Sequence, residues 1–263
     1  MIRKILKISL AIALAFLFIT LVSFAVDKNR DLPCKGVSVS IDYLRGQHFI
    51  NAEDVKAKVL NATGPLEGKP ITVGKLSLIE SVVAGIPSVS KTSVFRNIDG
   101  GLTINISQRQ PIVRVLNVHG QGFYIDHSGH LMPLSPDYTA HVIVATGHIQ
   151  AGYSPLINLA SVRPDNEISS NEKRLRDLYR LALHIESQAF WNAFIDHIFV
   201  LPNGQFELTP KNGAHVIEFG DLNQMEMKFG KLMTFYQNGL AWIGWNHYRR
   251  INVKYSNQVI CSK

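Results

Sequence analysis

The stretch that decides the fold of the first domain reads VSKTSVFRNIDGGLTINIS and runs from residue 89 to residue 107. Apolar and polar side chains alternate over residues 102–107, as they do in a half-buried strand. Asp99-Gly100-Gly101 supplies a turn, because glycine adopts a positive φ without steric cost. The stretch therefore predicts a β-hairpin, with its first arm over residues 89–97 and its second over residues 102–107.

The chain before this hairpin predicts one strand and two helices. Residues 37–41 alternate apolar and polar side chains, which is typical of a half-buried strand. Asn51 is a suitable N-terminal cap for a first helix, and a second helix is expected over residues 76–84, with Gly85 at its end. The expected order is strand, helix, helix, strand, strand, within a small domain of residues 35–111.

An uncharged apolar run near the N-terminus predicts a membrane anchor. Residues 8–26 read ISLAIALAFLFITLVSFAV. At about 1.5 Å per residue, a helix of this length crosses a hydrocarbon core of roughly 30 Å. Arg3, Lys4 and Lys7 precede the run, and the positive-inside rule places such residues in the cytoplasm. The expected topology is a cytoplasmic tail of residues 1–7, one transmembrane helix, and all later residues on the far side.

A cleaved signal peptide is the competing interpretation of this run. Ser23-Phe24-Ala25 has the small residues that a signal peptidase site needs. However, the apolar run is longer than the roughly 7–15 residues that such peptides have. The expectation is therefore a retained anchor, with cleavage as the open alternative.

Residues 112–263 predict a second domain that mixes helices and strands. Apolar residues at helical spacing predict one helix over residues 171–190 and another over residues 222–238. Short alternating segments predict strands, and the Asn-Gly pairs at 203–204 and 212–213 predict hairpin turns. The expected fold class is α+β, with an antiparallel sheet in this second domain. The expected strands cover residues 112–116, 123–125, 141–145, 195–200, 205–209, 215–219 and 250–255.

Charge and cysteine content narrow the classes of function. The net charge is +7, but the basic residues beyond the N-terminus form no stripe with interleaved aromatic residues, so nucleic-acid binding is not expected. Cys34 and Cys261 either form a disulfide, which an extracytoplasmic compartment permits, or remain two free thiols. His127 and His130 beside Asp126 fit a solvated turn better than a metal site. No metal or cofactor is therefore expected.

Three segments, in a fixed order along the chain, carry a resemblance to a known family. Residues 85–111 contain GIPSV, then VFR, then LTINISQRQP. Residues 124–132 read YIDHSGHLM, and the tail from Gly244 to Cys261 ends in INVKYSNQVIC. Together they resemble the bacterial cell-division family FtsQ/DivIB, in the version of its Bacteroidota-like members. The Trp usual in the first segment and the Trp-Pro usual after VFR are missing here.

The resemblance implies both a fold and a role. Residues 35–111 would be a POTRA domain and residues 112–263 the β-domain of this family. Both would lie in the periplasm, behind a single-pass anchor in the inner membrane at the division septum. The protein would be a non-enzymatic assembly component that binds FtsB and FtsL and needs no cofactor. The partner-binding residues carried over from the family's last strand are Lys254, Tyr255, Ser256, Asn257, Gln258 and Val259.

Physical reasoning from the tail points the same way. An alternating segment that closes a chain can be an edge strand with unpaired backbone groups. An extended partner can pair with such an edge, and pockets for alternate side chains then give specificity. Tyr255 is either an anchor for the partner or a residue of the domain core, since aromatic residues serve both purposes.

Two other functions compete with this interpretation. A POTRA-bearing accessory of outer-membrane protein assembly or secretion would have several such units or a following barrel of alternating strands, and the sequence shows neither. Ser170 and Lys173 have the S-x-x-K spacing of acyl-transfer enzymes, but the S-D-N and K-T-G partners of that chemistry are missing. Ser169 and Glu172 match a capping box at the start of the long helix, which explains this segment without catalysis.

Overall fold

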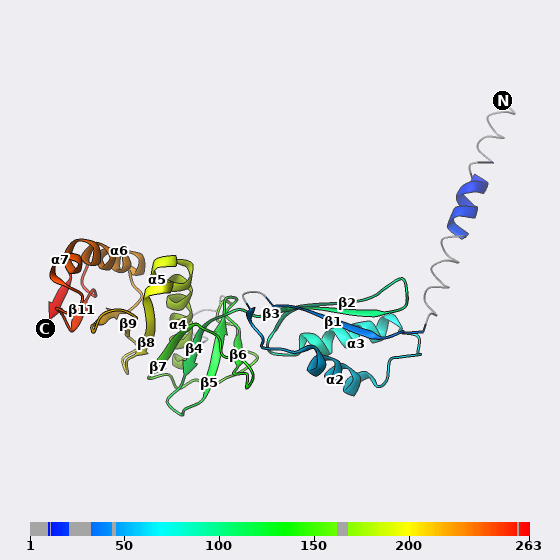
Figure 1. Cartoon of the computed structure of the whole chain (residues 1–263), viewed down its shortest axis with the longest axis horizontal. Coiled ribbons are helices and arrows are strands. Elements are labelled where there is room, and N and C mark those ends of the chain that lie inside the picture. Colours follow the sequence, from blue (N-terminus) through cyan, green and yellow to red (C-terminus); the bar gives the residue numbers. More distant parts are fainter. Residues whose placement is uncertain (1–9, 11, 21–32, 44–45, 162–167, 257) are drawn as a thin grey trace. The chain divides into compact units, whose positions relative to one another are not determined.

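The computed structural model describes residues 10, 12–20, 33–43, 46–161, 168–256 and 258–263. The chain divides into two compact units, Met1–Gln108 and Arg109–Lys263, and each has its own sheet. Figure 1 shows the elements of both units coloured along the chain. The two units are described separately below.

The first unit is a three-stranded sheet with two helices on one face (Figure 1). Its elements are β1 (Val37–Asp42), α2 (Ala52–Thr63), α3 (Val73–Ala84), β2 (Val89–Arg96) and β3 (Leu102–Gln108). The strand order is β1-β3-β2, with β1 parallel to β3 and β2 antiparallel to β3. The predicted hairpin and the predicted order of strand, helix, helix, strand, strand are confirmed.

Side-chain caps fix where the two helices begin. The Asn51 side chain accepts a hydrogen bond from the Asp54 N–H at 2.7 Å, which confirms the predicted start of α2. Helix α3 begins at Val73, three residues before the predicted start. Thr72 explains the difference, because its hydroxyl accepts from the Lys75 N–H at 3.4 Å and so caps an earlier turn.

Gln108 ends the first unit with a fully bonded side chain. Its Oε1 accepts from the N–H groups of Phe49, at 2.9 Å, and Ile50, at 3.2 Å. Its Nε2 donates to the carbonyl oxygens of Asp42, at 3.3 Å, and Gln47, at 3.0 Å. The side chain is buried and therefore connects the end of β3 to the end of β1 and to the segment before α2.

The predicted membrane anchor lies partly outside the described residues. Residues 8, 9, 11 and 21–26 of the predicted span, and the whole predicted tail of residues 1–7, are not described. Residues 12–20 are helical. Among the described residues, no helix has both the length and the apolar character needed to span a membrane.

The second unit contains a nine-stranded sheet that mixes parallel and antiparallel pairs. Its strands are β4 (Pro111–Leu116), β5 (Gly122–Asp126), β6 (Leu131–Pro133), β7 (Ile143–Gly147), β8 (Ile195–Val200), β9 (Phe206–Pro210), β10 (Val216–Gly220), β11 (Arg250–Asn252) and β12 (Ile260–Ser262). Their order in the sheet is β12-β11-β10-β9-β8-β7-β4-β5-β6. Strands β12 and β6 are therefore its two edges.

The prediction of an antiparallel sheet in this unit is wrong. The pairs β4–β7, β7–β8 and β10–β11 are parallel. Parallel neighbours need a crossover connection, usually a helix. Helices α4 (Ser170–Ser187) and α5 (Ala189–Phe194) lie between β7 and β8 in the chain, and α6 (Met225–Phe235) lies between β10 and β11. Alternation shows which face a side chain occupies but not the direction of the neighbouring strand, which is why the sequence pattern missed these pairs.

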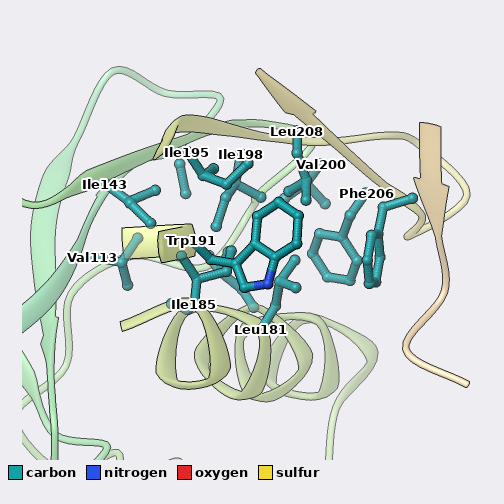
Figure 2. Packing of buried hydrophobic residues seen from close by; sticks show 14 of the residues in the cluster. Val113, Ile143, Leu181, Ile185, Trp191, Ile195, Ile198, Val200, Phe206 and Leu208 are labelled. Carbon is teal, nitrogen blue, oxygen red and sulfur yellow. The ribbon is translucent and has the colours of Figure 1, made fainter. Parts of the chain in front are cut away.

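One core fills the space between the helices and the sheet of the second unit. Trp191 of α5 lies between Leu181 and Ile185 of α4 and the strand residues Ile198 and Val200 (Figure 2). All five side chains are buried. The single helix predicted over residues 171–190 is interrupted at Gln188, which has an extended backbone (φ −108°, ψ 109°) and so lets α5 turn Trp191 into this core.

The second long helix of this unit starts later than predicted and changes type. Helix α6 begins at Met225 after Gln224, whose φ is 54°. It continues as a π-helical turn, η3 (Tyr236–Leu240), and then as α7 (Ala241–Ile243). Tyr236 of this turn is buried, and its hydroxyl lies 2.9 Å from Nε2 of the buried His215. Burial raises the pKa of Tyr236 and lowers that of His215, and so favours the neutral form of both groups.

Candidate partner-binding surface

The free edge of the sheet at β12 is the strongest candidate for a binding surface. β12 pairs with β11 through Ser262 opposite Arg250 and Ile260 opposite Asn252. Within the part of the chain that the structure describes, no strand pairs with the other side of β12. Ile260 is 45% exposed at this edge. An extended segment of another protein can therefore extend the sheet here by strand addition.

The predicted binding residues do not lie on a strand in the structure. The strand predicted over residues 250–255 ends at Asn252, and Lys254, Tyr255, Ser256, Gln258 and Val259 lie on the connection between β11 and β12. Asn257 is outside the described residues. The reason is local, because the Asn252 side chain accepts from the Lys254 N–H at 3.0 Å and turns the chain out of the ladder.

Lys231 of α6 holds this connection in place. Its Nζ donates to the carbonyl oxygen of Val253 at 3.0 Å and also to the carbonyl oxygen of Tyr255. These two carbonyls therefore bond to a helix side chain instead of a neighbouring strand. Burial and the nearby ammonium of Lys228 lower the pKa of Lys231.

Tyr255 points outward, whereas its neighbour Val253 is part of the core. The Tyr255 side chain is 52% exposed and Val253 is fully buried. Of the two roles that the sequence left open for Tyr255, the core role is therefore excluded.

A largely apolar groove runs beside the β12 edge. Gln258 and Val259 form one wall, and the outer face of α6 and η3 forms the other. A Cβ atom added at Gly230 would meet no atom within 4 Å, so the helix wall is open at this point. The groove brings two of the predicted residues together with a helix surface that offers apolar contacts. The helix residues that line it are Met227, Gly230, Lys231, Thr234, Phe235, Asn238 and Gly239.

Ion pairs between side chains connect the adjacent strands β9, β10 and β11. Arg250 bonds to the carboxylates of Glu218 and Glu207, and Lys254 Nζ lies 3.3 Å from Glu218 Oε2. Asn252 donates to the same Glu218 oxygen at 2.7 Å. The hydrogen bond from Arg250 is the main reason that the pKa of Glu218 lies below its ordinary value.

This network predicts a defined response to acid. The lowered pKa of Glu218 means that its stabilising contribution is complete above the ordinary value of 4.5 and is lost as the pH falls through the lower, folded-state value. In Glu218→Gln, the loss of unfolding free energy between pH 6 and pH 3 should be smaller than in the wild type. Urea unfolding across this pH range measures it. The same change at Glu53, whose side chain is 84% exposed, serves as the control and should leave the profile unchanged.

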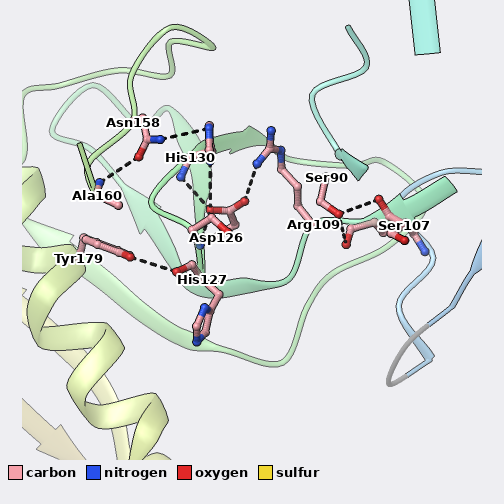
Figure 3. Close-up of polar contacts among 11 residues, drawn as sticks. Ser90, Ser107, Arg109, Asp126, His127, His130, Asn158, Ala160 and Tyr179 are labelled. Atoms are coloured by element: carbon pink, nitrogen blue, oxygen red, sulfur yellow. Dashed lines mark hydrogen bonds and ion pairs between the residues drawn. The ribbon is translucent and has the colours of Figure 1, made fainter. Parts of the chain in front are cut away.

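The other candidate chemistries have structural explanations. The Ser169 hydroxyl accepts from the Glu172 N–H at 3.1 Å, so this serine caps α4, as predicted. The Asp126 carboxylate accepts from the N–H groups of Ser128, at 2.9 Å, and His130, at 2.7 Å, and from Arg109, at 2.8 Å (Figure 3). This carboxylate therefore organises a turn.

The described residues were also considered as metal ligands and disulfide partners. No group of three or more His, Cys, Asp or Glu side chains among them is arranged to hold a metal ion. Cys34 is buried in the first unit, and Cys261 is half-buried on β12 in the second. Both are free thiols in the structure.

Two features of the candidate surface were not predicted from the sequence. β12 itself was treated as the end of a longer tail, although the Ser256-Asn257 pair is a turn signal that separates it from β11. Lys231 carries no local signal, because its partners lie more than twenty residues away in the chain.

Comparison with known proteins matches the second unit to a family. The family described as FtsQ/DivIB, C-terminal related, matches residues 110–262, which include all nine strands of the large sheet. A search of curated proteins finds no match. The matched region covers more than half of the chain and ends at β12. The chain belongs to the FtsQ/DivIB family.

Proposed function

We propose that this chain is a non-enzymatic assembly protein of the cell-division machinery, anchored in the inner membrane and folded in the periplasm. Membership of the FtsQ/DivIB family gives it a role in cell division. The uncharged run of residues 8–26, preceded by Arg3, Lys4 and Lys7, supports a single anchor with a cytoplasmic N-terminus. The domains would be a cytoplasmic tail (residues 1–7), the anchor, and two periplasmic domains.

The first periplasmic domain, residues 35–111, is proposed to be a POTRA domain. The order of its elements and the sheet order β1-β3-β2, with both helices on one face, support this assignment. The second domain, residues 112–263, is proposed to be the β-domain that receives partners.

The partners proposed are FtsB and FtsL, with an extended segment of FtsB added to β12. The free edge of β12 beside the groove under α6 is the observation that supports this proposal most directly. Each added backbone hydrogen bond contributes only about 0.5–1.5 kcal/mol. Specificity therefore has to come from side chains. The side chains proposed to provide it are those of Tyr255 and Ile260, which are exposed, and of Gln258 and Val259, which line the groove.

Ile260→Asp tests this proposal. The carboxylate would be desolvated without a partner when a strand covers the edge, which costs well over the 1.4 kcal/mol that corresponds to tenfold in affinity. We expect capture of purified FtsB–FtsL complex by the full chain to weaken at least tenfold, measured by titration on immobilised protein. Tyr255→Glu should weaken capture in the same direction.

Ile98→Asp is the matched control. Ile98 is 90% exposed and lies in the β2–β3 turn of the first unit, so the same chemical change there should leave capture intact. Undiminished capture by a folded Ile260→Asp variant would exclude β12 as the binding edge. Equal losses in both variants would mean that added charge, and not position, causes the effect.

A further inference from the structure

The first unit also has an unprotected strand edge, on the outer side of β1. In a parallel pair, alternate residues direct both backbone groups toward the neighbouring strand. Leu102 of β3 donates to the Gly36 carbonyl at 2.9 Å, so Gly36, Ser38 and Ser40 face β3. The N–H and C=O groups of the residues between them, Val37, Val39 and Ile41, point away from β3, and no described strand pairs with them.

The two edges of this sheet are not equally protected. The pairing of β2 with β3 contains a bulge between Val89 and Lys91, and β2 carries the charges of Lys91 and Arg96. Bulges and charges are common devices that keep an edge from pairing. β1 reads VSVSID, pairs with β3 without a bulge, and contains no lysine, arginine or proline. An edge of this composition is suited to accept another strand.

The apolar side chains of β1 are also incompletely covered. Val37, Val39 and Ile41 are only half-buried, whereas Leu102, Ile104 and Ile106 on the adjacent β3 are buried. A pocket opens beside Val37, between α2 and the segment after it, and its apolar lining includes Val59, Leu60, Pro65 and Leu66. Leu60 is 43% exposed at this pocket.

The β1 sequence is complementary to itself. When two copies are placed antiparallel with Val39 opposite Val39, Val37 of each copy faces Ile41 of the other. Ser38 of each faces Ser40 of the other, and Asp42 faces Gly36. The backbone groups that point outward, on residues 37, 39 and 41, then meet one another and bond across the two-fold axis. No like charges face each other in this register.

We propose that β1 is a self-association edge, where a second copy of this chain pairs antiparallel about Val39. The two sheets become one, and Ile41 of each copy covers the mouth of the other's pocket beside Val37. The free edge ends where the Gly68 N–H donates to the Cys34 carbonyl at 2.9 Å, which limits the paired segment to about seven residues. So short an interface is weak in solution and depends on confinement of both copies to one surface.

Cysteine pairs across this register give a sharp test. In the proposed pairing, Ser38 and Ser40 of the two copies lie about 4.5 Å apart between Cα atoms, which suits a disulfide. The Cα atoms of the two Ser38 residues lie about 8 Å apart, as follows from a rise of roughly 3.3 Å per residue and a strand spacing of about 4.8 Å. This distance is too long for a disulfide. Full-length Ser38→Cys and Ser40→Cys chains, each also carrying Cys34→Ala and Cys261→Ser, are co-expressed in native membranes and oxidised. Both serines are exposed, so the substitutions leave the fold intact.

We expect at least fivefold more cross-linked dimer in the mixture than with either variant alone. The matched pair on β2, Lys91→Cys with Ser93→Cys, occupies the equivalent register there and should give only background. Adding Val39→Pro, which removes the central outward N–H, should abolish the dimer, whereas Val94→Pro on the outer edge of β2 should not. A mixture that gives no more dimer than the single variants, or an adduct with a different polypeptide in place of the second copy, would overturn the proposal.

Discussion

Trp191→Ala should destabilise the second unit by about 3–5 kcal/mol, the range for removing a large aromatic side chain from a packed core. Trp191 is 5% exposed and sits where α5, α4 and the sheet meet (Figure 2). Its ring centroid is 5.0 Å from that of Phe229 and 6.2 Å from that of Tyr236. Both partners belong to the helical segment that forms one wall of the groove beside β12, so the cavity left by alanine also loosens that wall.

Urea denaturation of the full chain in detergent, followed by far-ultraviolet circular dichroism, measures this loss. Trp242→Ala removes the same side chain from α7, where it is 87% exposed, and should change the unfolding free energy by less than about 0.5 kcal/mol. Similar effects of the two substitutions would show that the aromatic cluster around Trp191 does not organise the core of this unit.

The parts of the fold that the sequence predicts correctly have local causes. The hairpin of the first unit follows from Asp99-Gly100-Gly101 and from alternation on its second arm. Gly100 does have a φ of 91°, which a residue with a side chain rarely adopts. The cap at Asn51 is equally local, because its acceptor and donor lie three residues apart. Such signals need no knowledge of the rest of the chain.

Several of the errors come from interactions between distant parts of the chain. Alternation continues from Arg250 to Tyr255, and this pattern predicts one strand. The strand stops at Asn252, whose side chain takes the Lys254 N–H. Lys231, on a helix more than twenty residues earlier, then takes the carbonyls of Val253 and Tyr255. The parallel pairs of the large sheet have the same kind of cause, since they depend on which strands a crossover helix brings together. The sequence pattern thus indicated an edge strand in this part of the chain, but it assigned that strand to residues 250–255, whereas the edge strand is β12.

Gln108→Ala should cost the first unit about 3 kcal/mol. All four hydrogen-bonding positions of this buried amide are used, and each bond contributes about 0.5–1.5 kcal/mol net. The substitution also leaves a cavity at the place where β1, β3 and the segment before α2 meet. Urea denaturation of the full chain measures the loss, and Gln150→Ala, at an exposed position of the second unit, should be neutral.

Gln108→Glu separates the two halves of this contact, because it keeps the shape of the side chain and the acceptor for the N–H groups of Phe49 and Ile50. It replaces the donor with a carboxylate oxygen that faces the carbonyl oxygens of Asp42 and Gln47. The ionised form is therefore repelled, whereas the protonated form regains one donor. The variant should be at least as unstable as Gln108→Ala at pH 7 and should recover part of the loss relative to wild type as the pH falls toward 4. A Glu variant with wild-type stability at pH 7 would show that the donated bonds to Asp42 and Gln47 do not hold β1 in place.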